Sequence, residues 1–158
     1  MSRNRALGII AAVALWGAGA GLAPAAEPDV QRGRYMVLVG HCNNCHTAGY
    51  APKQGNVPES EWLLGNPVGM RMQTGTSYAS NLRLTVQSYT EDSWVKYVKT
   101  AKWRPPMPWW SMHETSEEDL RAMYRYIRHM GPAGKMMPAF VPPDRNPDPP
   151  YETRQIVK

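Results

Sequence analysis

The two cysteines of this 158-residue chain lie close together, as Cys42 and Cys45, and His46 follows directly. Disulfides, zinc sites and covalent haem attachment all use two closely spaced cysteines, and the spacing C-x-x-C-H is typical of haem attachment. If the segment is helical, the two thiols share a face and can form thioether bonds to one porphyrin, while the imidazole reaches the iron from the same side. The motif therefore predicts one covalently bound haem c, held by Cys42, Cys45 and His46.

Two other uses of the cysteines fit the sequence less well. A structural zinc site needs four ligands, usually supplied as two separated pairs, and the chain has no second pair of cysteines. A redox-active disulfide needs no adjacent histidine, and no βαβ pattern surrounds this motif. A domain with a disulfide and without haem is a third, purely structural interpretation.

Residues 1–25 have the pattern of an export signal. Arg3 and Arg5 precede an uncharged apolar run over residues 7–22, and Ala-Pro-Ala at 23–25 resembles a cleavage site. The arginines are not adjacent, which favours the general secretion route over the twin-arginine route. We therefore expect a periplasmic protein. An uncleaved anchor, which would attach the domain to a membrane, is the alternative, although the run is short for a membrane span.

The excess of basic residues does not indicate nucleic-acid binding. The whole chain carries a formal charge of +5, and removal of residues 1–25 leaves 16 basic and 13 acidic residues. Two ionised haem propionates would lower the charge of that product to about +1. No nucleic-acid partner is therefore expected, because such a product lacks the strongly basic surface that binds nucleic acids.

Three amphipathic helices are predicted, over residues 28–42, 90–102 and 115–130. Residues that favour helix N-termini stand at their starts: Pro28, Thr90, and either Thr115, with the capping box Thr115-x-x-Glu118, or Ser116. Gly33, inside the first helix, costs about 1 kcal/mol relative to alanine and so suggests close approach of another element. About 45 residues between the first two helices lack a convincing regular element, and we expect them to wrap around the haem.

An electron carrier needs a sixth iron ligand, and a thioether sulfur opposite histidine is the pairing that raises the reduction potential. The stretch KWRPPMPWWSMHE at 102–114 offers Met107, Met112 and His113. Prolines at 105, 106 and 108 restrict the chain around Met107 to extended geometry, so this methionine is presented on a stiff loop. We predict Met107 as the axial ligand, with Met112 or His113, or an open site, as the alternatives.

Four stretches occur in an order that matches a known family over about residues 28–131. They are GRYMVLVGHCNNCHT at 33–47, GTSYASNL at 75–82, PPMPW at 105–109 and TSEEDLRAMYRYIR at 115–128. They resemble the monohaem class I c-type cytochromes, and more closely the haem domains of cytochrome subunits of bacterial periplasmic alcohol and aldehyde dehydrogenases. Those subunits often contain three such domains in one chain, whereas this sequence has one C-x-x-C-H motif.

The resemblance implies a small all-α, cytochrome c-like fold, with three main helices and long loops around one haem. In that fold the first and last helices cross, which would place Gly33 against Tyr126 or a neighbour. The resemblance also implies that the axial ligands are His46 and Met107. Two further residues would lie near the propionate edge of the haem: Tyr78 and Asn81.

A haem with both axial positions filled has no open site for a substrate, so we expect an electron carrier and not an enzyme. Its donor would be a periplasmic or membrane-bound dehydrogenase, and its acceptor another cytochrome or a terminal oxidase. A peroxidase-like haem enzyme or a gas sensor, with an open distal site, is the alternative. On the second predicted helix a basic ridge of Lys96, Lys99 and Lys102 is either a docking surface or an ordinary solvated face.

The sequence divides into a signal peptide at 1–25, a cytochrome c domain at 26–131 and a proline-rich tail at 132–158. The tail has seven prolines by Pro150 and no helical period. Such a composition favours extended structure without a packed core of its own. We expect either a strap, a partner-binding segment or a disordered tail.

Overall fold

The computed structural model describes residues 28–154. The predicted signal peptide at 1–25 therefore lies outside the described residues. The helices are α1 (Pro28–Val39), α2 (Cys42–His46), α3 (Leu82–Thr85), α4 (Glu91–Thr100), α5 (Trp109–Glu114) and α6 (Glu117–His129), and the strands are β1 (Gly69–Met72), β2 (Gly75–Ser77) and β3 (Tyr151–Thr153). Within the described range no helix has the length and apolarity needed to cross a membrane.

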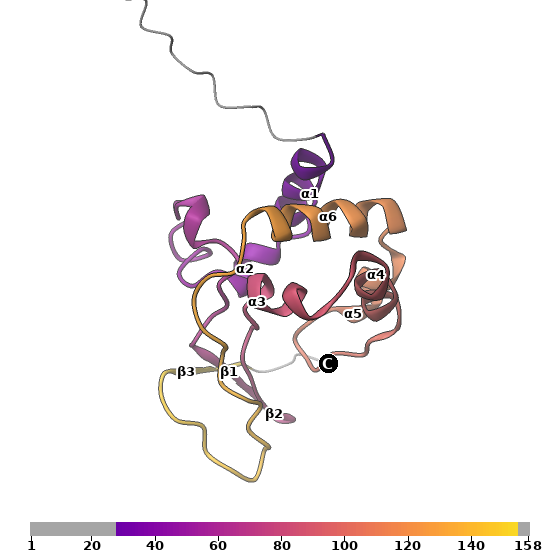
Figure 1. Cartoon of the computed structure of the whole chain (residues 1–158). Coiled ribbons are helices and arrows are strands. Elements are labelled where there is room, and N and C mark those ends of the chain that lie inside the picture. The colour runs from indigo at the N-terminus through magenta and orange to yellow at the C-terminus, as the bar shows by residue number, and fades with distance from the viewer. Residues whose placement is uncertain (1–27, 155–158) are drawn as a thin grey trace, which may run out of the picture.

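Helices α1 and α6 cross at Gly33 (Figure 1). A Cβ atom at position 33 would lie 2.0 Å from the carbonyl oxygen of Ala122 and 2.7 Å from Cβ of Tyr126. Only a residue without a side chain lets two helix backbones approach so closely. The expected partner of Gly33 is thereby confirmed.

Side-chain hydrogen bonds cap the N-termini of α4 and α6. Thr90 accepts a hydrogen bond from the Ser93 N–H, and Ser93 Oγ accepts one from the Thr90 N–H, so the predicted N-cap of α4 is confirmed. The cap of α6 is Ser116, whose Oγ accepts from the Asp119 N–H at 3.1 Å. The capping box predicted at Thr115 is wrong, because Thr115 is instead the C-cap of α5.

The predicted first helix is divided into two. α1 ends at Val39, and His41 adopts the left-handed conformation, with a φ of 55°, before α2 begins at Cys42. A non-glycine residue with positive φ is uncommon. Gly40, directly after Val39, is the local signal for the end of α1, because glycine is common just past a helix C-terminus. The break separates the cysteines from the face that α1 packs against α6.

A small sheet lies at the end of the molecule away from α1 and α6 (Figure 1). β1 pairs antiparallel with β2 and parallel with β3, in the order β2-β1-β3. The expectation that the segment between the first two predicted helices lacks regular elements is wrong for β1, β2 and α3. These elements are only three or four residues long, too short for the periodic pattern by which a strand or helix is recognised in a sequence.

The proline-rich tail is an extended strap that crosses this sheet. β3 pairs with β1, and Val141 exchanges two backbone hydrogen bonds with Thr76 of β2. Asn81 holds the start of the tail, because its Nδ2 donates to the carbonyl oxygens of Ala133 (2.8 Å) and Lys135 (3.2 Å). Residues 132–154 thus form the expected strap, and a role in partner binding stays a prediction.

The apolar core lies between α6 and the two helices that pack against it, α1 and α4. Its buried side chains include Leu120, Met123 and Ile127 of α6 and Trp94 and Val98 of α4. Helices thus make up most of the regular structure of residues 28–154, with a small three-stranded sheet that the predicted all-α fold did not include. Assignment to the cytochrome c-like fold stays a proposal.

Candidate functional site

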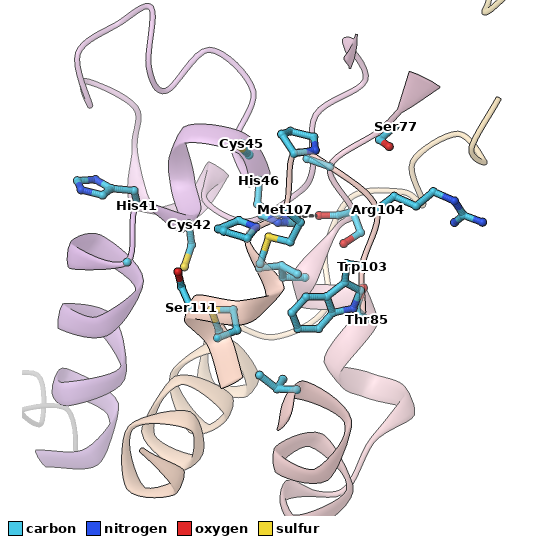
Figure 2. Close-up of a pocket in the computed structure, with 18 of the residues that line it drawn as sticks. His41, Cys42, Cys45, His46, Ser77, Thr85, Trp103, Arg104, Met107 and Ser111 are labelled. Carbon is cyan, nitrogen blue, oxygen red and sulfur yellow. Dashed lines mark hydrogen bonds between the residues drawn. The ribbon is translucent and has the colours of Figure 1, made fainter. Parts of the chain in front are cut away.

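A cavity of about 970 Å³ separates α2 from the segment that joins α4 to α5. Figure 2 shows Cys42, Cys45 and His46 extending from α2 on one side, while Met107 reaches in from the loop before α5. Pockets that hold small molecules and cofactors have volumes of about 300–1,000 Å³, so this cavity is large enough for a cofactor. Its lining includes five of the six predicted site residues: Cys42, Cys45, His46, Tyr78 and Met107.

The two cysteines lie on α2 as free, half-buried thiols. The predicted helical spacing is confirmed, and both side chains line the same cavity. Burial raises the pKa of the Cys42 thiol to about 11, so this thiol is neutral at pH 7. Because the two cysteines are not bonded to each other, the structure does not favour the disulfide interpretation.

A hydrogen bond orients the ring of His46. Its Nδ1 lies 2.7 Å from the carbonyl oxygen of Ser80, and a carbonyl oxygen can only accept, so Nδ1 carries the proton. Burial lowers the pKa of the imidazole and so favours the neutral ring. The hydrogen bond to Ser80 raises the pKa and offsets part of this effect. A neutral histidine whose Nδ1–H is bound to a carbonyl has its Nε2 lone pair free to bind a metal.

Met107 lies in a loop that is tied to the sheet. Ser77 Oγ of β2 donates to the carbonyl oxygen of Pro105 at 3.0 Å, and the Met107 N–H donates to the carbonyl oxygen of Arg104 at 3.2 Å. The structure therefore positions the predicted ligand from two sides, by a strand and by a turn of the loop itself.

The two alternative ligands differ in their positions. Met112 on α5 also lines the cavity and packs against the core. His113 does not line the cavity, and its Nε2 lies 3.0 Å from the carbonyl oxygen of Ala101. The side chain of His113 is thus committed elsewhere, and two methionines are left as candidates.

Tyr78 and Asn81, the two residues predicted near the propionate edge, have different positions. Tyr78 is half-buried and lines the cavity. Asn81 is fully buried and does not line it: its Oδ1 caps α3 by accepting from the Leu84 N–H, and its Nδ2 binds the tail. Both ends of the Asn81 amide are engaged, so we assign Asn81 a structural role in place of the expected cofactor contact.

Sequence patterns had not marked some of the residues that line the cavity. Pro138 and Phe140 come from the tail, which has no period that would assign a side chain to one face. Trp94 is a buried residue of α4, and helical spacing does not show that it also lines the cavity. Ser80, whose carbonyl oxygen orients His46, lies in the stretch GTSYASNL, but the resemblance assigned it no role.

The chemistry of the lining shows what kind of group would suit the cavity. Two thiols, an imidazole and a thioether are the ligands that haem c requires. Apolar and aromatic side chains, among them Trp94, Val98 and Ile127, line the same cavity and would bury the apolar faces of a porphyrin. The residues that line the cavity therefore fit a haem.

No cluster of three or more His, Cys, Asp or Glu side chains that could hold a metal ion occurs between residues 28 and 154.

The basic ridge on α4 is partly engaged by the rest of the protein. Lys99 Nζ donates to the carbonyl oxygen of His113 at 2.8 Å, and Lys102 Nζ lies 5.5 Å from the ring centroid of Trp109. Two of the three lysines therefore have contacts within the protein.

Comparison with known proteins found two partial similarities. The chain is 24% identical to the cytochrome subunit of a fructose dehydrogenase from Gluconobacter japonicus over 115 residues, which are 66% of this chain and 22% of that protein. It is 29% identical to the cytochrome c subunit of a gluconate 2-dehydrogenase from Pantoea cypripedii over 111 residues, 63% of this chain and 23% of that protein. These similarities support a cytochrome c-like subunit.

The chain spans less than a quarter of the length of the curated relatives it matches. No family model and no solved structure matches it.

Proposed function

We propose that this chain binds one haem c covalently through Cys42 and Cys45, with His46 and Met107 as axial ligands, and that it carries single electrons. The observation that carries the proposal is the cavity itself, because it brings two thiols, an oriented imidazole and a thioether together from separate parts of the chain. When bound, the haem supplies an iron that changes its charge by one electron, and His/Met ligation leaves no position for a substrate.

The protein residues would orient the ligands and exclude water. Ser80 fixes the ring of His46, and the Pro105 carbonyl bound to Ser77 fixes the loop of Met107. Apolar side chains of α4 and α6, including Val98 and Ile127, form the deep wall of the cavity. Such partners tune a bound metal by holding ligand geometry and by limiting access of solvent.

For the partner, we propose a periplasmic or membrane-bound dehydrogenase as electron donor. The two relatives are named as cytochrome subunits of dehydrogenases, and the alignment with them covers about two thirds of this chain. The chain would be exported and would act either as a small monohaem class I cytochrome that shuttles electrons or as a subunit of the dehydrogenase. The acceptor would be another cytochrome or a terminal oxidase.

The proposal is tested on protein produced in a host that attaches haem c. The haem should remain on the polypeptide after denaturation and acid-organic extraction, because unfolding does not break thioether bonds. The ferric protein should show the weak far-red charge-transfer band of a sulfur-to-iron bond, and Met107→Ala should abolish that band while the haem stays attached.

Met112→Ala is the matched control, because Met112 lines the same cavity. It should leave the far-red band in place, and loss of the band in this variant alone would identify Met112 as the ligand. Extractable haem, or none, would refute covalent attachment. Wild-type protein that lacks the band and binds carbon monoxide or cyanide at once would favour a haem enzyme or gas sensor.

A further inference from the structure

The tail reaches the cavity and forms part of its wall. Pro138 and Phe140 both line it, although the sequence separates them widely from Cys42, Cys45 and His46. Phe140 is fixed against β2: a Cβ atom at Gly75 would lie 2.5 Å from Cζ of the Phe140 ring and 2.6 Å from the carbonyl oxygen of Val141. Gly75 has a φ of 117°, which favours glycine. Because this residue has no side chain, the Phe140 ring packs directly against the strand backbone.

On its other side Phe140 contacts the loop of Met107. The Arg104 guanidinium lies 4.2 Å from the centroid of the Phe140 ring, close enough for a cation–π interaction. The carbonyl oxygen of the same Arg104 accepts the hydrogen bond from the Met107 N–H. Arg104 therefore connects the ring of the tail to the backbone of the predicted ligand, and Figure 2 shows Arg104, Trp103 and Met107 on this loop at the cavity.

We propose that Phe140 is a positioning residue for Met107: through Arg104 it holds the loop so that the thioether stays in the cavity. This inference rests on the proposed function, in which Met107 binds iron. β2 supports the arrangement twice, because Thr76 pairs with Val141 of the tail and Ser77 binds Pro105 of the loop. The loop is thus held between the strand and the tail.

The loop of Met107 depends on contacts with the strand and the tail because it has no regular backbone hydrogen bonding of its own. The chain between α4 and α5, residues 101–108, contains no helix or strand, and three of its residues are prolines that donate no backbone hydrogen bond. A ligand on such a segment is released whenever the segment moves away. An exposed cation–π contact shifts an equilibrium of this kind by about two- to fivefold.

The test measures how fast cyanide replaces the thioether in the ferric haem protein. At saturating cyanide the rate reports release of Met107, since the entering ligand must wait for the loop to open. Arg104→Leu and Phe140→Leu should each raise this rate about two- to fivefold. The double variant should be no faster than the faster single variant, because the two side chains act through one contact.

Tyr151→Leu is the matched control. Tyr151 belongs to the same tail and has a similar contact, with the Arg71 guanidinium 5.7 Å from its ring centroid, but neither residue lines the cavity. The rate at which cyanide replaces the thioether in Tyr151→Leu should equal the rate in the wild type. Retention of the far-red band and of the circular dichroism spectrum in each variant would show that the fold and the ligand are intact.

Three results would overturn the inference: unchanged rates in Arg104→Leu and Phe140→Leu, rate effects that multiply in the double variant, or an equal effect of Tyr151→Leu. These results differ from failure of the proposed function. If the wild type has no far-red band and binds cyanide without delay, Met107 is not a ligand. If the band is present and the rates do not respond, only the role of Phe140 is refuted.

Discussion

Replacement of Gly33 by alanine should destabilise the protein, although alanine is the better helix former. The gain in helix propensity is about 1 kcal/mol. The new Cβ atom would lie 2.0 Å from the Ala122 carbonyl oxygen, whereas an ordinary contact is 3.4–4 Å, so α1 and α6 must separate by more than an ångström. The obstacle is backbone and cannot rotate away. Overpacking costs about 1–3 kcal/mol. Because the clash is with backbone, the upper end of about 3 kcal/mol applies, and subtracting the gain leaves a net loss of about 2 kcal/mol.

The assay is guanidinium chloride unfolding of the haem-loaded protein, followed by far-UV circular dichroism. The midpoint should fall for Gly33→Ala and fall further for Gly33→Val, since the cost grows with the size of the side chain. Tyr35→Ala, on an exposed position of the same helix, is the control and should change the free energy of unfolding by about 0.5 kcal/mol or less. A midpoint for Gly33→Ala equal to or above that of the wild type would refute the reasoning.

Two further changes test the tail and the surface charges. Asn81→Leu removes the two hydrogen bonds to the tail and the cap of α3. The free energy of unfolding should therefore fall by about 3 kcal/mol in the same assay. A fall of less than about 1 kcal/mol would show that other contacts hold the tail. Glu91 of α4 binds Arg125 and Arg121 of α6, and the hydrogen bond from Arg125, supported by Arg121, lowers the pKa of its carboxyl below the ordinary 4.5. The stability that this carboxylate provides is therefore complete above pH 4.5 and is lost as the pH falls through the lowered value. The difference in unfolding free energy between the wild type and Glu91→Gln should shrink over that range, and a difference independent of pH would contradict this assignment.

Sequence reasoning succeeded where a residue type has one dominant local use. Thr90 caps α4, Gly33 lies at a helix crossing, and the cysteines share a helix, because each of these depends on spacing or on a single side chain. The choice between Thr115 and Ser116 stayed open in the sequence because both are good caps. The structure resolves it through the hydrogen bond from the Asp119 N–H.

The features that the sequence did not reveal depend on contacts between distant segments. β1 and β3 are too short to show a period, and their pairing joins residues about eighty positions apart. Asn81 stands in a stretch that resembles a haem-binding segment, yet its amide is used by the tail, which the resemblance does not include. The basic ridge was inferred from the helical spacing of its lysines, and spacing cannot show that Lys99 Nζ binds the carbonyl oxygen of His113.

The tail also bears on the order in which the site is assembled. A ribosome makes Cys42 and Cys45 well before Phe140, and β3, which pairs with β1, follows later still in the sequence. Pro138 and Phe140 are the last of the lining residues to be synthesised. The wall that they form can be completed only after the helix that carries the cysteines and the loop of Met107 have been made, when the tail can pair with the sheet.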